Sequence, residues 1–409
     1  MARTKGAKNK PKYDNNFAII NLNKQVDNSP EINDRGYTDY VKWGKNNDYP
    51  MFLLNLYENS VIHHSCIDFI TAAICGERIS NLKDEMPAPN INETWETFLN
   101  EIALQYALFN AFAFQIVKNK DGKTYSFYAQ PIPTIRLAKK DGEGNVKSAF
   151  LCQDWTQTAI YKPVEIDMFN FAEDEEIKSS KPYLFAYFKK NLVDPYYSTP
   201  SYVSALNSIK ASINMQDFDF NSTENSFTPS GIIELNQIEN EEERSKVLRN
   251  IKDTFTGAKN ASNLIVTFKN SNEDQPIGFT AIAADTENIN KFADTSDRIC
   301  NSIVCAHRVP NKSLLGMPVE SQGFSDQGNI LEVSYNLMER VVISQKRKTI
   351  LTIINKCFAL NNVDVQLEIE PLHFNLRQID DTESASTAQE TNETVDDKQA
   401  ENNDELINK

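Results

Sequence analysis

Residues 285–361 constrain the fold most, because their apolar pattern predicts two long helices joined by a polar loop. Over residues 287–307 apolar side chains recur at three- and four-residue steps, which predicts a helix about 30 Å long. Val309 and Pro310 end this helix, since proline lacks a backbone donor and disfavours helical geometry in the residue before it. The same spacing predicts the second helix over about residues 326–360. The apolar stripe of the first helix consists of Ile289, Phe292, Ile299, Ile303 and Ala306.

Two features of this pair suggest more than a simple hairpin. Few other helices are predicted close to the first helix in sequence, which favours packing of its stripe against other copies of the chain. The loop between the helices places Arg308 and Lys312 beside a glycine-containing turn, an arrangement suited to a mobile finger. An ordinary helical hairpin with a surface loop explains the same periodicity.

The remaining folded part predicts a mixture of helices and antiparallel strands. A helical pattern follows Pro50 and ends at Gly76, where left-handed geometry costs a glycine little. A second amphipathic helix begins near Trp95, with its cap near Asn92. Aspartate–glycine pairs between alternating runs predict antiparallel hairpins. These pairs are at 121–122 and 141–142, and further strands are predicted at 185–188, 232–235, 264–268, 277–281 and 363–369.

Several of these stretches resemble one known family in the same order. Residues 303–316, I-V-C-A-H-R-V-P-N-K-S-L-L-G, resemble the segment of tailed-bacteriophage portal proteins in which a helix is followed by a V-P turn and L-L-G. Three other matches are W-G-x-N-x-x-Y-P at 43–50, Y-x-x-P-x-Y-x-x-A-L at 197–206 and N-x-F-x-P-x-G at 225–231. The resemblance covers roughly residues 40–375, most of the chain.

The resemblance implies an α+β portal fold, with an α/β wing, two long stem helices flanking a small α/β clip, then a tunnel loop and a long helix. The implied parts are a disordered basic arm (1–16), the wing (17–199), the first stem helix (200–228), the clip (229–285), the second stem helix (286–308), the tunnel loop (309–325), the long helix with a returning wing strand (326–375) and a disordered acidic tail (376–409). The chain is short for this family, and the acidic tail replaces the helical crown of larger members.

The resemblance also implies a function. Portal proteins form a ring, dodecameric in the family, at one capsid vertex of the virion, and double-stranded DNA passes through the axial channel during packaging and ejection. Such a protein is not an enzyme and needs no cofactor or metal. The implied partners are the large terminase, the head-to-tail adaptor, the major capsid protein and the scaffold protein, with no membrane.

Three groups of residues carry these implied roles. The tunnel-loop residues facing DNA would be Arg308, Asn311, Lys312, Ser313, Gln322 and Ser325. The stem would pack through Ile289, Phe292, Ile299 and Ile303. The clip would dock the terminase and the adaptor through Glu241, Glu242, Arg244, Lys252 and Lys259.

Charge and composition agree with a protein that holds DNA loosely. The formal net charge is −15, and residues 380–409 carry −8 of it, from ten acidic residues and two lysines. Phosphate affinity comes mainly from clustered Lys and Arg, so a strong grip on nucleic acid is not expected. No secretory signal or membrane-length apolar run occurs, which predicts assembly in the host cytoplasm. Six cysteines in 409 residues indicate reduced thiols rather than a disulfide framework.

Chemical motifs are sparse. No Walker-type loop, H-E-x-x-H or G-x-S-x-G sequence occurs. Cys300, Cys305 and His307 have no standard zinc spacing, so they are interpreted as structural residues. His63 and His64 are adjacent and point to different helix faces, which predicts solvated or capping histidines.

One basic cluster remains in the folded part. It consists of Lys346, Arg347 and Lys348 with Arg340, and it could bind DNA or, more simply, an acidic patch on a neighbouring copy. Two other functions stay open. One is a head or neck adaptor that binds neighbours without enclosing DNA. The other is a metal-dependent nuclease that uses either carboxylates or Cys300, Cys305 and His307.

Overall fold

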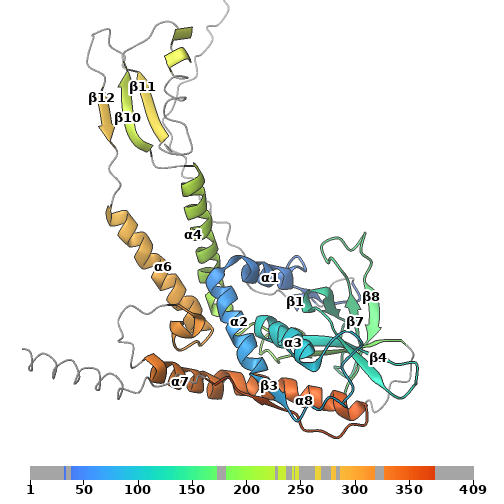
Figure 1. Ribbon diagram of the computed structural model, residues 1–409. Helices are drawn as coiled ribbons and strands as arrows, with labels where there is room; N and C mark the ends of the chain where they lie inside the picture. Colours follow the sequence, from blue (N-terminus) through green and yellow to red (C-terminus); the bar gives the residue numbers. More distant parts are fainter. Residues whose placement is uncertain are drawn as a thin grey trace, which may run out of the picture.

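The computed structural model describes residues 32–33, 38–172, 181–225, 229–235, 242–243, 245–247, 263–268, 278–281, 286–317 and 327–373. An α/β body forms one end of the molecule, and two long helices lead from it to a small separate sheet (Figure 1). The fold is therefore α+β, as the sequence predicted. No described helix is both long and apolar enough to cross a membrane.

The body is built around helices packed on a three-stranded antiparallel sheet. Its central strand, β4 (Ala111–Lys118), lies between β5 (Tyr125–Ala129) and β9 (Tyr183–Phe188). The first four residues of β4 are buried on both faces, so Phe112 and Phe114 both belong to the core. Helix α3 (Trp95–Phe109) packs on this sheet, and Phe98 lies 5.6 Å from Phe114 between ring centroids. Burial of these aromatic rings is the largest source of stability in the body.

Hairpin turns were predicted at the two aspartate–glycine pairs, and both are present. Gly122 has φ 68° in the turn between β4 and β5. The second turn joins β6 (Ile135–Leu137) to β7 (Ser148–Leu151), which also pairs with β8 (Val164–Asp167). In that turn the positive φ belongs to Gly144, at 87°, rather than to Gly142. Asp141 holds the turn, because its side chain accepts the backbone N–H groups of residues 143 and 145.

The helical pattern before Gly76 is two helices rather than one. Helix α1 (Tyr49–Asn59) and helix α2 (Val61–Cys75) are separated by Ser60, whose extended backbone (φ −101°, ψ 108°) breaks the helix. The cap of α3 is Thr94, two residues after the predicted position, and its side chain accepts the N–H of residue 97. Asn92 donates its own N–H to the Asn90 side chain, so it serves the preceding turn instead.

The two long helices are α4 (Leu206–Asn225) and α6 (Thr286–Ala306). They converge where they meet the body, and a three-stranded sheet lies beyond their far ends (Figure 1). In that sheet β10 (Pro229–Leu235) is central, parallel to β11 (Asn263–Phe268) and antiparallel to β12 (Gly278–Ala281). This helix–sheet–helix order is the one that the sequence predicted for residues 200–308.

The last long helix is interrupted. Helix α7 (Gln327–Met338) continues through a π-helical turn at residues 339–343 into α8 (Ser344–Leu360). The returning strand predicted at 363–369 is shorter: β13 covers only Glu368–Glu370, antiparallel to β3 (Arg78–Ser80). Only these three residues pair with β3, and an ion pair of 2.7 Å between Arg78 and Glu370 joins the two strands. A two-stranded sheet of β1 (Ile32–Asn33) and β2 (Lys42–Trp43) completes the described strands.

Candidate functional site

The carboxyl end of α6 is the point where the long helices, the predicted tunnel loop and the body meet. Residue 308 follows the helix in left-handed geometry, with φ 57°, and its N–H donates a hydrogen bond to the carbonyl of residue 305. Pro310 follows at the expected position. Asn311 then caps a short 3₁₀ turn over Lys312–Leu315, because its side chain accepts the N–H of residue 313. Gly316, with φ 76°, ends that turn.

This geometry bears on the predicted tunnel loop. Of the six residues predicted to face DNA, four lie in or beside the compact turn: Arg308, Asn311, Lys312 and Ser313. The other two, Gln322 and Ser325, lie outside the described residues. Arg308 is exposed and Lys312 is half-buried. A DNA contact by these residues stays a prediction.

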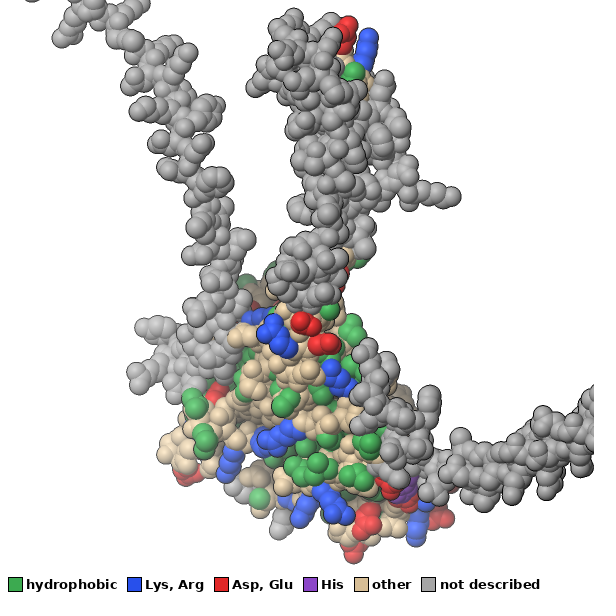
Figure 2. Space-filling view, turned by 90° about the vertical axis from the view of Figure 1, so that its left-hand side faces the viewer, with side chains coloured by type: hydrophobic (Ala, Val, Ile, Leu, Met, Phe, Trp, Pro, Cys, Tyr) green, Lys and Arg blue, Asp and Glu red, His purple; other side chains and the backbone are tan. Residues whose placement is uncertain are grey.

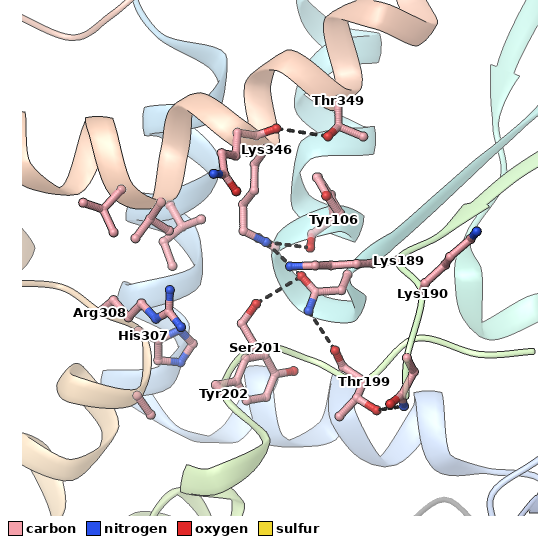
Figure 3. Close-up of a pocket in the computed structure, with 18 of the residues that line it drawn as sticks. Tyr106, Lys189, Lys190, Thr199, Ser201, Tyr202, His307, Arg308, Lys346 and Thr349 are labelled. Atoms are coloured by element: carbon pink, nitrogen blue, oxygen red, sulfur yellow. Dashed lines mark hydrogen bonds between the residues drawn. The ribbon is translucent and has the colours of Figure 1, made fainter. Parts of the chain in front are cut away.

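A cavity of about 540 Å³ opens beside Arg308 (Figure 3). Segments far apart in the sequence line it: α2, the end of α3, the end of β9 with the residues after it, the loop before α4, the end of α6, and the π-helical turn with the first residues of α8. We call it the basic pocket, because its charged lining residues are Lys189, Lys190, Arg308 and Lys346. No carboxylate of the described residues lines it.

Asn110 organises the floor of the basic pocket. It ends α3 in left-handed geometry, with φ 50°, which asparagine tolerates better than most residues. Its side chain donates to the Thr199 carbonyl (2.7 Å) and accepts from the Ser201 hydroxyl (3.1 Å). The same side-chain oxygen accepts from Lys346 Nζ at 3.0 Å. One asparagine thus ties α3, the loop before α4 and α8 together.

The surroundings of Lys346 disfavour the charged form of its amine. Its Nζ lies 4.5 Å from the centre of the Tyr106 ring, a cation–π contact. Burial, and then the positive charges of Lys189 and Arg308, lower the pKa of Lys346 to about 7. The pocket therefore concentrates positive charge that no described carboxylate offsets.

A histidine pair lies on the other side of the α6 end. His63 Nδ1 on α2 and His307 Nε2 are 2.9 Å apart, so one nitrogen donates to the other. Both rings are buried, and each lies against Tyr202. Burial lowers the pKa of both histidines to about 3; His307 adds to the effect on His63, and Lys346 adds to the effect on His307. The pair is neutral at ordinary pH.

The prediction that His63 and His64 are both solvated or capping was wrong for His63. Helix α2 packs against α1, α3 and α6, so its His63 face is completely enclosed. His64 lies on the opposite face, half-exposed, where it pairs with Asp68 at 3.1 Å. A periodic pattern could not show that α2 is covered from several sides.

The basic cluster of Lys346, Arg347 and Lys348 with Arg340 was predicted to bind DNA or a neighbouring copy. The structure differs from this prediction at Arg347. Arg347 is buried and pairs with Glu339 inside the chain. Its guanidinium also donates to the carbonyls of Ala73 and Ile74, at the end of α2. These carbonyls have no partner within their helix, so Arg347 caps α2. Lys348 and Arg340 are exposed, so the predicted surface contact of these two side chains stays a prediction.

The predicted stem-packing residues divide in two. Ile303 is completely buried within the single chain and Ile299 is partly buried, because the lower part of α6 packs against α2 and α4. Packing of Ile303 against other copies was therefore a wrong prediction. The side chains of Ile289 and Phe292, further up the helix, lie outside the described ones.

The structure describes few of the residues on which the clip and metal predictions rest. Glu242 is exposed, whereas Glu241, Arg244, Lys252 and Lys259 lie outside the described residues. Within the described ranges no three His, Cys, Asp or Glu residues are grouped to hold a metal ion. Cys300 is buried and Cys305 is exposed, on different faces of α6.

Sequence reasoning missed Asn110, Lys189 and Lys190. An asparagine directly after a predicted helix is a recognisable end signal. The two lysines after β9 carry no signal, because only the fold brings them to Arg308 and Lys346.

Comparison with known proteins gives one kind of match. No known protein-family model matches the chain, and no curated protein sequence does. Solved structures do match. A chain from the virion of the native gene transfer agent particle has a TM-score of 0.54 at 11% identity, over 83% of this chain and 87% of that chain.

Two further matches come from the neck of the same kind of particle. A chain from the neck of the empty particle, computed with C6 symmetry, has a TM-score of 0.54, and one from the native neck, computed with C12 symmetry, has 0.53. Both are 11% identical, over 81% of this chain and 85% of the other. The chain thus shares its fold with chains of the gene transfer agent particle.

Proposed function

We propose that this chain is a portal protein of a phage-like particle: a ring at one capsid vertex through which double-stranded DNA is packaged and ejected. The observation that carries the proposal is the fold likeness, which extends over more than four-fifths of both chains in each match. Such coverage includes the body and the two long helices, not one common motif. The C12 symmetry of one matched neck supports a dodecamer.

The surface of the helices suits a channel that releases DNA easily. Asp294 and Asp297 are exposed on α6, next to Arg298. A wall that is more acidic than basic repels phosphate at short range, so DNA slides rather than binds. In this proposal Arg308, Asn311, Lys312 and Ser313 approach the DNA at the base of α6.

The surface of α7 suits contact with a neighbouring subunit. Val333, Leu337 and Val341 follow one another at four-residue steps and are 68%, 57% and 54% exposed. Apolar and basic side chains are interspersed over the face of the body in Figure 2. An exposed apolar stripe gains free energy when a second copy covers it. The sheet of β10, β11 and β12 would face outward and dock the terminase and then the adaptor.

The mass and symmetry of the purified protein test this proposal. Light scattering should give the mass of about twelve subunits, and negative-stain class averages should show a ring with a central hole. A second measurement after mixing with scaffold protein tests whether ring assembly requires the scaffold. A closed dimer without a channel, unchanged by scaffold, would contradict the proposal.

A further inference from the structure

Only Arg308 of the basic pocket takes part in the proposed DNA contact, although six separate segments build the pocket. Lys189 and Lys190 come from the end of β9, Arg308 from the end of α6 and Lys346 from α8. Hydroxyls of Thr199, Ser201 and Thr349 line it as well (Figure 3). Three cations, Lys189, Lys190 and Arg308, share the cavity with the partly charged amine of Lys346, and no carboxylate of the described residues lies on its wall, which calls for an anionic ligand.

We propose that the basic pocket binds the acidic carboxyl-terminal segment, residues 380–409, of the same chain or of a neighbouring copy. This segment holds ten acidic residues and two lysines, so its net charge is −8. The inference goes beyond the portal function and does not require a ring.

The segment starts close enough to reach the pocket. His373, the last described residue, donates its N–H to the Glu77 side chain at 2.9 Å, just past the end of α2. Ile70, on the same helix, lines the pocket, and Gly76 lies six residues further on, roughly 9 Å along the axis. Residues 374–379 span up to roughly 20 Å when extended, so the first acidic residues reach the cavity.

The shape of the site favours carboxylate side chains over duplex DNA. A duplex presents its phosphates along a convex backbone and needs a long basic track. The basic pocket is instead a cavity of about 540 Å³ that admits a few side chains. The acidic residues of helices, such as Asp294, are fixed on rigid elements, whereas the terminal segment supplies many carboxylates in sequence. A carboxylate at Lys346 would also favour the charged amine, whose pKa the pocket lowers.

The contact is expected to be weak by itself and effective because it is tethered. Ordering each residue costs conformational entropy, so only a few residues of the segment are held at once. Attachment to the same particle supplies an effective concentration in the millimolar range. Because the contact is electrostatic, salt should weaken it, since the Debye length falls to about 3 Å at 1 M.

Zero-length carbodiimide cross-linking of the full chain, read by mass spectrometry, tests the proposal. The reagent joins a lysine to a carboxylate only when the two touch. Lys189 and Lys190 are exposed and should cross-link to acidic residues of 380–409, several-fold more than Lys162, which is equally exposed but lies outside the pocket. High salt should abolish the difference. Mixing ¹⁴N- and ¹⁵N-labelled protein separates links within one chain from links between copies.

A matched pair of variants sharpens the test. Arg308→Glu reverses one pocket charge and keeps both reporting lysines, so the cross-links should fall several-fold. Arg298→Glu makes the same charge change on the exposed face of α6, away from the pocket, and should leave them unchanged.

Three results would overturn the inference. Links from Lys189 and Lys190 only to acidic residues before residue 374 would assign the pocket to a folded surface. Terminal-segment links that are equal at Lys162 and unchanged in Arg308→Glu would show non-specific contact. Protection of both lysines by duplex DNA, without terminal-segment links, would make the pocket a DNA site. Light scattering of the same samples reports the ring separately, so a failed portal proposal remains distinguishable.

Discussion

At the scale of single residues, the most consequential contact is the buried His63–His307 pair. Two neutral rings joined at 2.9 Å hold α2 against the end of α6, and Tyr202 covers both. Burial is the main reason that the pKa of both histidines is lowered, and the positive charge of Lys346 adds to the effect at His307. Protonation would therefore place positive charge in an apolar site beside Lys346.

The pair predicts loss of stability in mild acid. Its histidines have pKa values of about 3 when folded, against 6.5 in a model peptide. The unfolded chain therefore takes up protons first as the pH falls below 6.5. Each histidine then lowers the free energy of unfolding by up to roughly 1.4 kcal/mol per pH unit, until the pH approaches 3. Above pH 6.5 this effect is absent.

Urea unfolding between pH 8 and 4 measures the effect. The variant His307→Gln should show a shallower decline with falling pH than the wild type, whereas His64→Gln, at a half-exposed site, should keep the wild-type slope. An unchanged slope in His307→Gln would mean that other groups dominate the acid response.

At the scale of elements, Gly76 joins α2 to the strand pair β3–β13. Its φ of 65° is left-handed, and a Cβ there would lie 2.1 Å from the Glu370 carbonyl oxygen and 2.5 Å from an Ile369 methyl group. Gly122 provides a matched comparison, since its φ is 68° and nothing lies within 4 Å of an added Cβ. Gly76 also has ψ −159°, a backbone region that is essentially restricted to glycine, so a substitution there meets an unfavourable backbone as well as a lack of space.

The variants Gly122→Ala and Gly76→Ala should therefore differ strongly in their loss of stability. Gly122→Ala should lower the free energy of unfolding by about 1–2 kcal/mol, the cost of left-handed geometry for alanine. Gly76→Ala should cost several kcal/mol more, because β13 must move away from α2. Chemical denaturation of both variants checks this. Equal losses would show that β13 adapts at little cost.

At the scale of the whole molecule, the proposed ring places Lys312 near the DNA path. Lys312 begins the 3₁₀ turn after α6, within the predicted loop over 309–325, and is half-buried. Lys312→Glu should lower the DNA packaged per particle several-fold through repulsion of phosphate, while the ring still forms. Lys162→Glu is the control. Loss of the ring in Lys312→Glu would make the turn structural rather than a DNA contact.

Much of the architecture could be read from the sequence because its signals are local. Apolar spacing, proline at 310, glycine at 76 and the two aspartate–glycine turns each act over a few residues, and the helices and hairpins lie where these signals indicate. The break at Ser60 and the π-helical turn at 339–343 were not visible, since the surrounding pattern is continuous across them.

The sequence alone determined the order of elements, the placement of the two long helices about a small sheet and the concentration of acid in residues 380–409. Only the tertiary structure decided which side chains meet. It buried His63 and Arg347, which the periodicity had placed at the surface, and it brought Lys189, Lys190, Arg308 and Lys346 to one cavity. The physical reason is that burial and charge convergence depend on contacts between segments over a hundred residues apart, and no local pattern records such contacts.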